Sequence, residues 1–443
     1  MQKISVSFII LAAGIGSRMQ SANPKVLHEV ANRSLIKHLL DKIFKLKTEI
    51  ELNKIIIVLG HEFNLVKRII QFTYPEIIFV KQKKQLGTAD AVLSAKKYTK
   101  DDFGKTIILC GDAPLISSNL LKKLINNSNS CDIGVVGFKT ENPFGYGRIV
   151  KGKLDFIEKI VEQNEANPVE KKIKLCNSGI LIGNTSFLMN LVTNIGYNKN
   201  KKEKYLTDIV QIARSKNKVV KLFVGNETEC IGVNTREDLA MVENEIQKDL
   251  RKKAMKKGVT LISPETVFFS YDTKISKDVI IGPNVVFGPK VKIEADVTIE
   301  AFCHLEGVTI KKGAKIGPFA RLRPGTLIQE NAKIGNFVEV KKSVIKKGSK
   351  VNHLSYIGDS EVGVDTNVGA GVITCNYDGV NKNKTIIKEK AFIGSNASLV
   401  APVKIGRGSI VGAGSVITKD IPDKTLAVER NKQVNIKKRL KKN

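Results

Sequence analysis

The sequence predicts an α/β domain followed by an all-β domain: a Rossmann-like fold over residues 1–236, a linker helix over 237–257 and a parallel β-helix over 258–443. Three observations predict this order. Short apolar runs alternate with amphipathic stretches in the first half of the chain, the next stretch has one apolar face at helical spacing, and apolar residues then recur at every sixth position. A chain of 443 residues is long enough to bury more than one core.

The α/β domain is predicted from the alternation of its apolar segments. One amphipathic stretch, residues 34–46, has its apolar residues at helical spacing. Strands that alternate with such helices form a largely parallel sheet covered by the helices. Five short apolar runs are predicted strands, at residues 6–11, 55–59, 77–80, 107–109 and 133–136.

The first 14 residues, MQKISVSFIILAAG, are similar to a signal peptide, because a lysine precedes a short apolar run and small residues. We expect a buried first strand instead, since cleavage there would remove the glycine loop that follows the run. No other apolar run approaches the length that spans a membrane. We therefore expect a cytoplasmic protein that does not enter the membrane.

The linker helix is predicted to begin at a capping box and to end at a glycine. Thr235 and Asp238 have the spacing at which each side chain caps the other residue's backbone N–H. Gly258 is the expected stop. The apolar face between them is formed by Leu239, Val242, Ile246, Leu250 and Ala254.

A six-residue period is the strongest architectural pattern in the chain. Three hexads close one triangular coil of a β-helix, with the aliphatic residue of each hexad inside. Many of these residues precede a glycine, as Ile281 precedes Gly282, and we expect this glycine to permit the corner. Residues 375–386 interrupt the repeat with polar and turn-forming residues, which predicts a loop that leaves the coil.

Composition narrows the functional classes. The net charge of +30 would suit nucleic acid or an anionic membrane as a partner. The excess is mostly lysine spread along the whole chain, and tryptophan is absent, so we expect a solvated surface, no nucleic-acid partner and anionic substrates. The six cysteines lie far apart without a CxxC pair, which predicts reduced thiols and neither a disulfide framework nor a zinc site.

A glycine loop, residues 11–16, follows the first predicted strand. Backbone N–H groups of such a loop can bind phosphate, and Arg18 and Lys25 add positive charge for a triphosphate. The loop lacks both the GxGxxG spacing of a dinucleotide fold and the ending of a P-loop. The glycine loop, Arg18-Met19 and Pro24-Lys25 at this spacing resemble the sugar-nucleotide pyrophosphorylase family.

Asp112 stands at the end of a predicted strand, where its carboxylate is placed to hold Mg²⁺. The resemblance implies that Asn234 shares this metal and that Arg18 and Lys25 are catalytic in the attack of a sugar 1-phosphate on a nucleoside triphosphate. It also implies a binding site for UTP and the UDP-sugar, composed of Leu11, Ala12, Ala13, Gly14, Lys25, Gln82, Gly87, Thr88, Cys110, Gly111, Asp112, Gly147, Glu162, Asn177 and Asn234.

Motifs in the β-helix indicate a second reaction. They are residues 319–325, 336–342, 353–356, 369–371 and 374–379. In this order they resemble the bacterial bifunctional family that combines N-acetylglucosamine-1-phosphate uridylyltransferase with glucosamine-1-phosphate N-acetyltransferase, and the resemblance covers nearly the whole chain. Acetyl transfer from a thioester needs a deprotonated amine, and His353 is the candidate base.

This resemblance implies a left-handed β-helix, a homotrimer, and the substrates glucosamine 1-phosphate, acetyl-CoA, N-acetylglucosamine 1-phosphate and UTP, in the route to peptidoglycan and lipopolysaccharide. The implied ligands of the acetyl acceptor are Arg323, Lys341, Tyr356 and Asn367. The implied contacts of acetyl-CoA are Ala370, Asn376, Tyr377, Ser395, Ala413 and Arg430.

Two positions depart from the family pattern. Ile15 replaces a lysine that is common in the glycine loop, so one phosphate contact is expected to be missing, and Cys110 replaces an aromatic residue that would pack the sugar or base. Three alternatives stay open: another bifunctional sugar-nucleotide enzyme, a pyrophosphorylase whose β-helix only assembles oligomers, and a scaffold that binds nucleic acid through its charge. His353 and the Asn376-Tyr377 segment argue against an inert β-helix.

Overall fold

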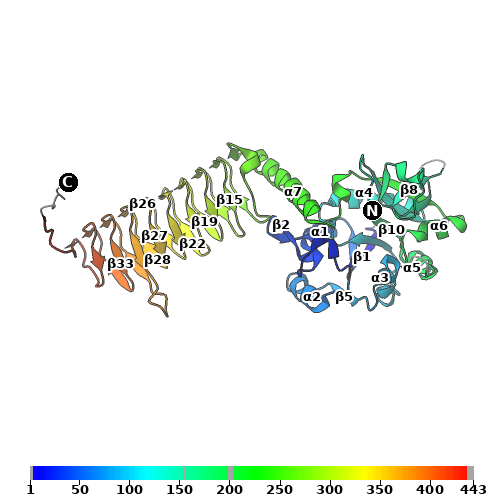
Figure 1. Cartoon of the computed structure of the whole chain (residues 1–443), viewed down its shortest axis with the longest axis horizontal. Coiled ribbons are helices and arrows are strands. Elements are labelled where there is room, and N and C mark those ends of the chain that lie inside the picture. Colours follow the sequence, from blue (N-terminus) through cyan, green and yellow to red (C-terminus); the bar gives the residue numbers. More distant parts are fainter. Residues whose placement is uncertain (1–2, 153–155, 198–202, 437–443) are drawn as a thin grey trace, which may run out of the picture. The chain divides into compact units, whose positions relative to one another are not determined.

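The computed structural model describes residues 3–152, 156–197 and 203–436. The chain divides into two compact units, Met1–Ile246 and Gln247–Asn443, which we describe separately. Within the described residues, every helix is too short or too polar to cross a membrane. The first unit has the predicted α/β fold and the second is a parallel β-helix (Figure 1).

A largely parallel sheet forms the centre of the α/β unit. All five predicted strands are confirmed. The strand β10 runs antiparallel to both of its neighbours, which the apolar pattern could not show. The order along the sheet is β11 (Val220–Val224), β7 (Ile133–Lys139), β10 (Leu175–Asn184), β6 (Lys105–Cys110), β1 (Ser5–Ala12), β4 (Glu51–Leu59) and β5 (Ile78–Lys81). Off this order, β8 (Arg148–Lys151) pairs with β10, and β9 (Ile157–Val161) pairs with β8.

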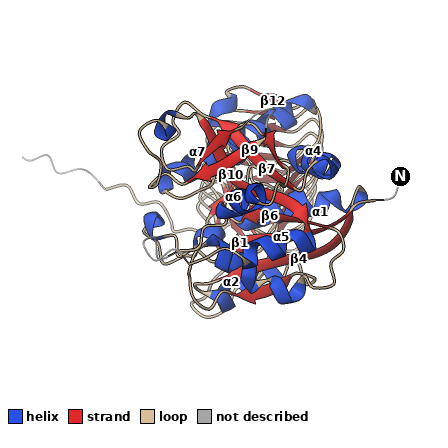
Figure 2. Ribbon diagram, turned by 90° about the vertical axis from the view of Figure 1, so that its right-hand side faces the viewer, coloured by secondary structure: helices blue, strands red, loops and turns tan. Residues whose placement is uncertain are grey.

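Helices cover both faces of this sheet (Figure 2). Successive side chains of β1 point to opposite faces, so Phe8 and Ile10 join one core while Ile9 joins the other. The first core includes residues of α1 (Leu35–Phe44), α2 (Phe63–Gln71) and α4 (Ser118–Asn127). The second includes residues of α3 (Thr88–Ser94), α5 (Thr185–Thr193) and α6 (Asp208–Ser215). A small hairpin, β2 (Glu29–Val30) and β3 (Arg33–Ser34), precedes α1.

The helix α7 (Arg236–Lys256) begins at the predicted capping box. The Asp238 carboxylate accepts a hydrogen bond from the backbone N–H of Thr235 at 2.9 Å. In return, the Thr235 hydroxyl accepts one from the N–H of Asp238 at 3.1 Å. The chain leaves the helix at Gly258, whose φ is +87°, so both predicted ends of the helix are confirmed.

The second unit is a coil of three parallel sheets, as the six-residue period predicts. Ile281 pairs with Ile299, one full coil later, and both side chains are fully buried. The first sheet consists of β12 (Thr260–Leu261), β14 (Ile280–Ile281), β17 (Thr298–Ile299), β20 (Lys315–Ile316), β23 (Lys333–Asn336), β26 (Lys350–His353), β29 (Asn367–Val368), β32 (Phe392–Ile393), β35 (Ile410–Val411) and β37 (Leu426–Ala427). We call it the His353 sheet.

The second sheet is named the Tyr356 sheet after its central strand. It consists of β15 (Val286–Phe287), β18 (His304–Leu305), β21 (Arg321–Leu322), β24 (Glu339–Lys341), β27 (Tyr356–Gly358), β30 (Ile373–Cys375), β33 (Ser398–Val400) and β36 (Val416–Ile417). The third consists of β13 (Lys274–Ile275), β16 (Lys292–Ile293), β19 (Val308–Ile310), β22 (Thr326–Ile328), β25 (Val344–Ile345), β28 (Ser360–Val362), β31 (Thr385–Ile387) and β34 (Val403–Ile405).

Most glycines that follow the hexad residues do not have the predicted role; Gly317, with a φ of +96°, is an exception. Gly282 does not adopt a positive φ; the left-handed residue at this corner is Asn284, with a φ of 56°. A Cβ on Gly282 would lie 2.7 Å from the backbone N of Ala301 in the next coil. The prediction that this glycine permits the corner was therefore wrong, because its missing side chain instead lets neighbouring coils approach closely.

The interruption at residues 375–386 is a loop, as predicted. It leaves the coil after β30 and returns at β31, and it projects from the β-helix in Figure 1. Tyr377 and Lys382 form an antiparallel bridge within it. The repeat continues without disturbance beyond the loop, since Val362 still pairs with Ile387.

Candidate active sites

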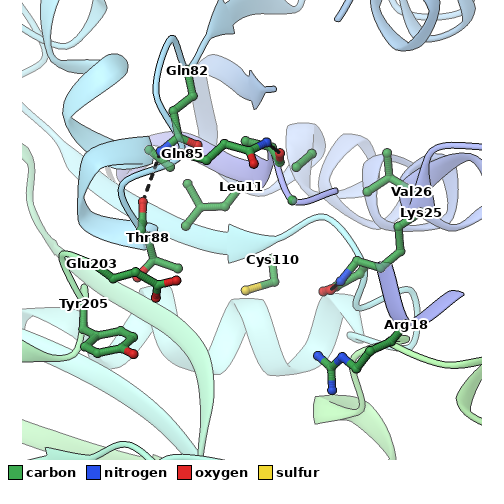
Figure 3. A pocket seen from close by; sticks show the side chains of 16 residues that line it. Leu11, Arg18, Lys25, Val26, Gln82, Gln85, Thr88, Cys110, Glu203 and Tyr205 are labelled. Atoms are coloured by element: carbon green, nitrogen blue, oxygen red, sulfur yellow. Dashed lines mark hydrogen bonds and ion pairs between the residues drawn. The ribbon is translucent and has the colours of Figure 1, made fainter. Parts of the chain in front are cut away.

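A cleft of about 520 Å³ lies in the α/β unit, at the carboxyl ends of β1 and β6. Ligands of open α/β sheets bind at this edge. Figure 3 shows Arg18 and Lys25 on one side of the cleft and Glu203 and Tyr205 on the other, with Cys110 between them. Eleven of the predicted residues line it: Leu11, Ala12, Ala13, Gly14, Arg18, Lys25, Gln82, Gly87, Thr88, Cys110 and Asp112.

Adjacent parallel strands bring the glycine loop and Asp112 together. Leu11 is opposite Cys110 in the register of β1 and β6, and the N–H of Gly111 donates to the Leu11 carbonyl at 2.9 Å. A Cβ on Gly111 would lie 3.1 Å from the Cβ of Ala12. Gly111 therefore packs behind the cleft and is not one of the residues that line it.

Lys25, Asp112 and Asn234 form one cluster. The Lys25 ammonium makes an ion pair with the Asp112 carboxylate and donates a hydrogen bond to Asn234 Oδ1 at 3.1 Å. The side chains of Lys25 and Asp112 are 15% and 17% exposed, so solvent screens their attraction only partly. The backbone N–H of Val233 donates to the Asp112 carbonyl at 2.9 Å, which fixes the Asn234 segment against β6.

The donor atoms of this cluster suit magnesium. Asp112 and Asn234 offer a carboxylate and an amide oxygen, which are ligand types that Mg²⁺ accepts. The described residues include no group of three or more His, Cys, Asp or Glu side chains that could enclose a metal. An ion bound here would complete its shell with phosphate oxygens and water, as Mg²⁺ in nucleotide sites usually does.

The segment of Gln82 and Gly87 forms the wall of the cleft that lies across from Arg18 and Lys25. The buried Gln82 amide donates to the Gly87 carbonyl at 3.2 Å and to Asp90 Oδ2 at 2.8 Å. Gly87 has a φ of +105°, and a Cβ there would lie 2.5 Å from the carbonyl oxygen of Lys204. The wall thus depends on glycine at this position for close packing against the segment that carries Glu203 and Tyr205.

Gly147, Glu162 and Asn177 form a second group outside the lining of the cleft. The N–H of Asn177 donates to the Gly147 carbonyl at 2.8 Å, and the Thr207 hydroxyl donates to Glu162 Oε1 at 2.7 Å. Tyr205 connects this group with the cleft, because it lines the cleft and lies two residues before Thr207, which bonds to Glu162. Burial and the charges of Glu203 and Glu162 raise the pKa of its phenol.

Cys110 also lies between the cleft and the second group. A Cβ on Gly179 would be 3.1 Å from its Sγ, so the thiol fills the space that a larger side chain would need. Burial and the charge of Asp112 raise the pKa of Cys110 to about 12, which keeps the thiol protonated at neutral pH. Ile15, the other departure, is 58% exposed and does not line the cleft.

Sequence reasoning missed four lining residues: Val26, Ala91, Glu203 and Tyr205. Val26 follows Lys25, and Ala91 lies one helical turn after Thr88, so both could have been inferred from neighbouring predicted residues. Glu203 and Tyr205 precede α6 in an irregular segment without a periodic pattern. No local signal in the sequence places that segment at the cleft.

In the β-helix unit, His353 lies at a corner where the His353 sheet ends and the Tyr356 sheet begins. Its Nδ1 is 2.6 Å from Oδ1 of Asn336, the residue paired with it in the preceding coil. The amide oxygen can only accept, so this contact holds the proton on Nδ1 and leaves Nε2 as the basic nitrogen. The ring is exposed to solvent.

Predicted acceptor residues gather along the far edge of the Tyr356 sheet. Lys341 Nζ lies 3.8 Å from Asp359 Oδ2, which also accepts from the Asn376 amide. A Cβ on Gly358 would lie 2.6 Å from the Tyr356 hydroxyl and 2.8 Å from the Asn376 amide nitrogen, so these polar groups surround one point.

Two residues that were predicted to bind the acetyl acceptor, Arg323 and Asn367, do not belong to this cluster. Arg323 follows β21 on the same sheet and donates to Glu339 Oε1 at 2.8 Å. Asn367 belongs to β29 of the His353 sheet and is not brought to the cluster in a single chain.

Four predicted acetyl-CoA contacts lie along the corner of His353, in the coils that follow it: Ala370, Ser395, Ala413 and Arg430. The N–H of Asn396 donates to the Ala370 carbonyl at 2.7 Å, and the N–H of Gly414 donates to the Ser395 carbonyl at 2.8 Å. Arg430 Nη1 donates to the Ala413 carbonyl at 3.2 Å. Tyr377 stands apart on the projecting loop and is 59% exposed.

The same corner carries a row of exposed apolar side chains in the coil of His353 and in the coils before it. We call this row the apolar ladder and define it as Phe302, Phe319, Phe337 and Leu354. Phe302 stacks on Phe319 with ring centroids 4.8 Å apart, and Phe319 stacks on Phe337 at 5.0 Å. All four side chains are between 44% and 62% exposed. A contiguous exposed apolar strip of this kind marks an interaction surface.

Comparison with family models agrees with the two units. Residues 8–171 match a MobA-like NTP transferase domain. Residues 272–307 and 384–419 match the bacterial transferase hexapeptide of six repeats, and residues 304–378 match a GMPPB C-terminal domain. Each model thus falls within one of the two units.

Whole-chain relatives are more informative. The bifunctional protein GlmU of Paramagnetospirillum magneticum is 45% identical over 99% of this chain and 96% of its own length. The GlmU of Zymomonas mobilis is 46% identical over 97% and 95%. Among solved structures, UDP-glucose pyrophosphorylase complexed with UDP-glucose is 19% identical over 56% of this chain and 100% of its own, with a TM-score of 0.45. The chain belongs to the bifunctional GlmU family, and its two activities are uridylyl transfer and acetyl transfer to glucosamine 1-phosphate.

Proposed function

We propose that the β-helix site acetylates glucosamine 1-phosphate first and that the α/β cleft then joins the product to the uridylyl group of UTP. The observation that carries this assignment is the separation of two different polar sites: cations and a carboxylate in the cleft, and an oriented imidazole on the β-helix. The acetylated sugar phosphate is the substrate that the second site activates.

In uridylyl transfer, a phosphate oxygen of N-acetylglucosamine 1-phosphate attacks the α-phosphorus of UTP. The new O–P bond forms as the bond to the β-phosphate oxygen breaks, and pyrophosphate leaves. Arg18 and Lys25 are the catalytic residues, because both line the cleft and stabilise negative charge that spreads over the phosphate oxygens. Their charges act at short range in a cleft that partly excludes water.

Asp112 and Asn234 would hold Mg²⁺ in this reaction, since both already contact one cation, the ammonium of Lys25. When bound, the ion supplies further neutralisation of phosphate charge. With these two oxygens taken by the ion, the Lys25 ammonium would be available to the triphosphate, since it lines the same cleft. The nucleotide is bound by the glycine loop and by the wall of Gln82, Gly87 and Thr88.

The sugar end of the substrate is assigned to the group of Gly147, Glu162 and Asn177. The segment of Tyr205 and Thr207 supports this assignment, because Tyr205 lines the cleft and the Thr207 hydroxyl donates to Glu162. A carboxylate and an amide side chain are suited to accept and donate hydrogen bonds to sugar hydroxyl and acetamido groups.

In acetyl transfer, His353 Nε2 takes a proton from the amine of glucosamine 1-phosphate. The amine attacks the thioester carbonyl, a C–N bond forms, the C–S bond breaks, and the proton held by His353 passes to the sulfur so that coenzyme A leaves as a thiol. Asn336 keeps the proton of the imidazole on Nδ1 and so presents the basic nitrogen. Lys341, Arg323 and Tyr356 bind the sugar phosphate, and the Asn376 amide joins them at the start of the projecting loop.

Asn367 and the column of Ala370, Ser395, Ala413 and Arg430 support a homotrimer. These residues lie at or beyond the His353 corner, whereas the acceptor cluster lies at the far edge of the next sheet. A second copy that packs its corner against this sheet would complete the site. The exposed apolar ladder gives such an interface a hydrophobic strip.

We place the enzyme in the cytoplasm without nucleic-acid or membrane partners. All six cysteines are free, as a reducing compartment requires. The anionic substrates are sugar phosphates and nucleotides, which gives a positively charged enzyme an advantage in encounter rate.

Omission of single substrates tests the proposed order. With glucosamine 1-phosphate, acetyl-CoA and Mg²⁺ but no UTP, acetylated sugar phosphate should accumulate. Without acetyl-CoA, UDP-sugar should form only when N-acetylglucosamine 1-phosphate is supplied. Rapid formation of a UDP-sugar from glucosamine 1-phosphate without acetyl-CoA would contradict the order.

A further inference from the structure

Two short 3-10 turns carry the cations of the α/β cleft. Arg18 is the central residue of the turn Ser17–Met19, and Lys25 begins the turn Lys25–Leu27. Neither turn is part of the sheet. The positions of both cations therefore depend on the contacts that hold these turns.

Arg236, the first residue of α7, contacts both turns. Its Nε donates to the backbone carbonyl of Met19 at 3.2 Å, and its Nη1 lies 3.3 Å from Nδ1 of His28. Met19 directly follows Arg18, and the N–H of His28 donates to the Lys25 carbonyl at 3.2 Å. One planar guanidinium thus joins the ends of both turns, which is a geometry that lysine cannot reproduce.

The contact with His28 requires a neutral imidazole. An arginine can only donate, so Nδ1 accepts and the ring proton lies on Nε2. That Nε2 is buried, and the backbone of Asn23 lies near the ring. Burial and the charge of Arg236 lower the pKa of His28, which keeps the ring neutral. A neutral ring leaves the Nδ1 lone pair available to Arg236.

Other contacts also hold the segment that carries the two turns, but they reach different residues of it. Asn234 reaches the Lys25 ammonium, and the Glu243 carboxylate accepts from the backbone N–H of Ala31 at 2.7 Å. Met19 and Val242 share a small apolar core. Arg236 is the contact that reaches the backbone of the first turn and the histidine that ends the second.

We propose that Arg236 is a positioning residue for uridylyl transfer: with His28 as its acceptor, it fixes the turns that aim Arg18 and Lys25 at the triphosphate. The inference rests on the proposed roles of Arg18 and Lys25. Arg236 does not line the cleft and so acts through these turns without touching the substrate. Small misplacements of such charged groups are costly to catalysis, although they need not alter substrate binding equally.

The test compares Arg236→Gln, Arg236→Lys and the control Arg68→Gln, an exposed arginine of α2 that lies outside this cluster. Both activities are measured in each protein: acetyl transfer reports whether the β-helix unit is folded, and the KM for UTP reports whether the α/β unit is folded. Arg236→Gln should lower kcat of uridylyl transfer about 10- to 100-fold and change KM for UTP less than about threefold. Arg236→Lys should be intermediate, and free guanidinium ion at a non-denaturing concentration should restore part of the Arg236→Gln activity, since this position is exposed.

An unchanged kcat in Arg236→Gln would overturn the inference, and so would an equal loss of both activities, which would indicate general destabilisation. Lys25→Ala, assayed in parallel, separates the positioning role of Arg236 from the catalytic roles of Arg18 and Lys25. If Lys25→Ala is inactive while Arg236→Gln is fully active, only the positioning role fails. If Lys25→Ala is also fully active, the proposed roles of the cleft cations fail.

Discussion

The two sites of this chain differ in how completely one copy of the chain assembles them. In the α/β cleft, Lys25, Asp112 and Asn234 are already in contact although 209 residues separate the first from the last. On the β-helix, His353 is exposed, and Asn367 lies on a different sheet from Lys341 and Tyr356. The comparison teaches that a parallel sheet gathers residues from distant segments at one edge, whereas a β-helix spreads its residues over separate flat faces.

The largest effect is expected where the site is complete in one chain. Lys25→Ala should lower kcat/KM of uridylyl transfer about 100- to 1000-fold, because it removes a preorganised positive charge at the reacting phosphates. Acetyl transfer in the same protein should not change. Lys123→Ala, at an exposed position of α4, is the matched control. A loss below about threefold in Lys25→Ala would remove this residue from the mechanism.

The next prediction concerns the orientation of His353. Asn336→Ala removes the acceptor that holds the proton on Nδ1, so a fraction of the imidazole presents the wrong tautomer. We expect kcat of acetyl transfer to fall about 10- to 100-fold while uridylyl transfer is unchanged. Asn336→Asp should retain more activity than Asn336→Ala, since a carboxylate also accepts from Nδ1–H. Equal activities of the two variants would show that the hydrogen bond does not matter.

Close packing of the coils can be tested independently of catalysis. A Cβ at Gly335 would lie 1.9 Å from the carbonyl oxygen of Asn352, so Gly335→Ala should lower the free energy of unfolding by about 2–3 kcal/mol. Gly196→Ala is the control, because no heavy atom lies within 4 Å of the Cβ position there. Chemical denaturation followed by circular dichroism gives both values. A stable Gly335→Ala protein would refute the packing role that we assign to these glycines.

The smallest effect is expected at the apolar ladder. Phe319→Ser should weaken self-association about tenfold, because it removes an exposed ring from the strip beside His353 while the hexad interior stays intact. Analytical ultracentrifugation over a range of concentrations measures this change. Phe392→Ser, at a ring of similar exposure on the His353 sheet, should associate like the unaltered protein. The opposite ranking of the two variants would place the interface elsewhere.

Patterns that repeat were predictable, and contacts between distant segments were not. The hexad residues and the Thr235–Asp238 capping box could be read directly, since each depends on neighbours within a few positions. The role of Gly282 could not be predicted, because the backbone against which it packs, at Ala301, belongs to the next coil.

The same limit applies to the α/β cleft. The glycine loop and Asp112 follow strands and were found by position, and family resemblance supplied Asn234. Glu203 and Tyr205 come from an irregular segment and were missed, since only the folded chain brings that segment against Gly87. By contrast, the six-residue period itself implies that Asn367 and Tyr356 lie on different sheets, because they are less than the three hexads of one coil apart.

The central claim, that one chain carries two separate active sites, is tested most directly by a crossed pair of variants assayed for both reactions. Asp112→Ala should abolish uridylyl transfer and spare acetyl transfer, and His353→Ala should do the reverse. A mixture of the two proteins should then convert glucosamine 1-phosphate to the UDP-sugar through the released intermediate. Loss of both activities in either folded variant would contradict the account.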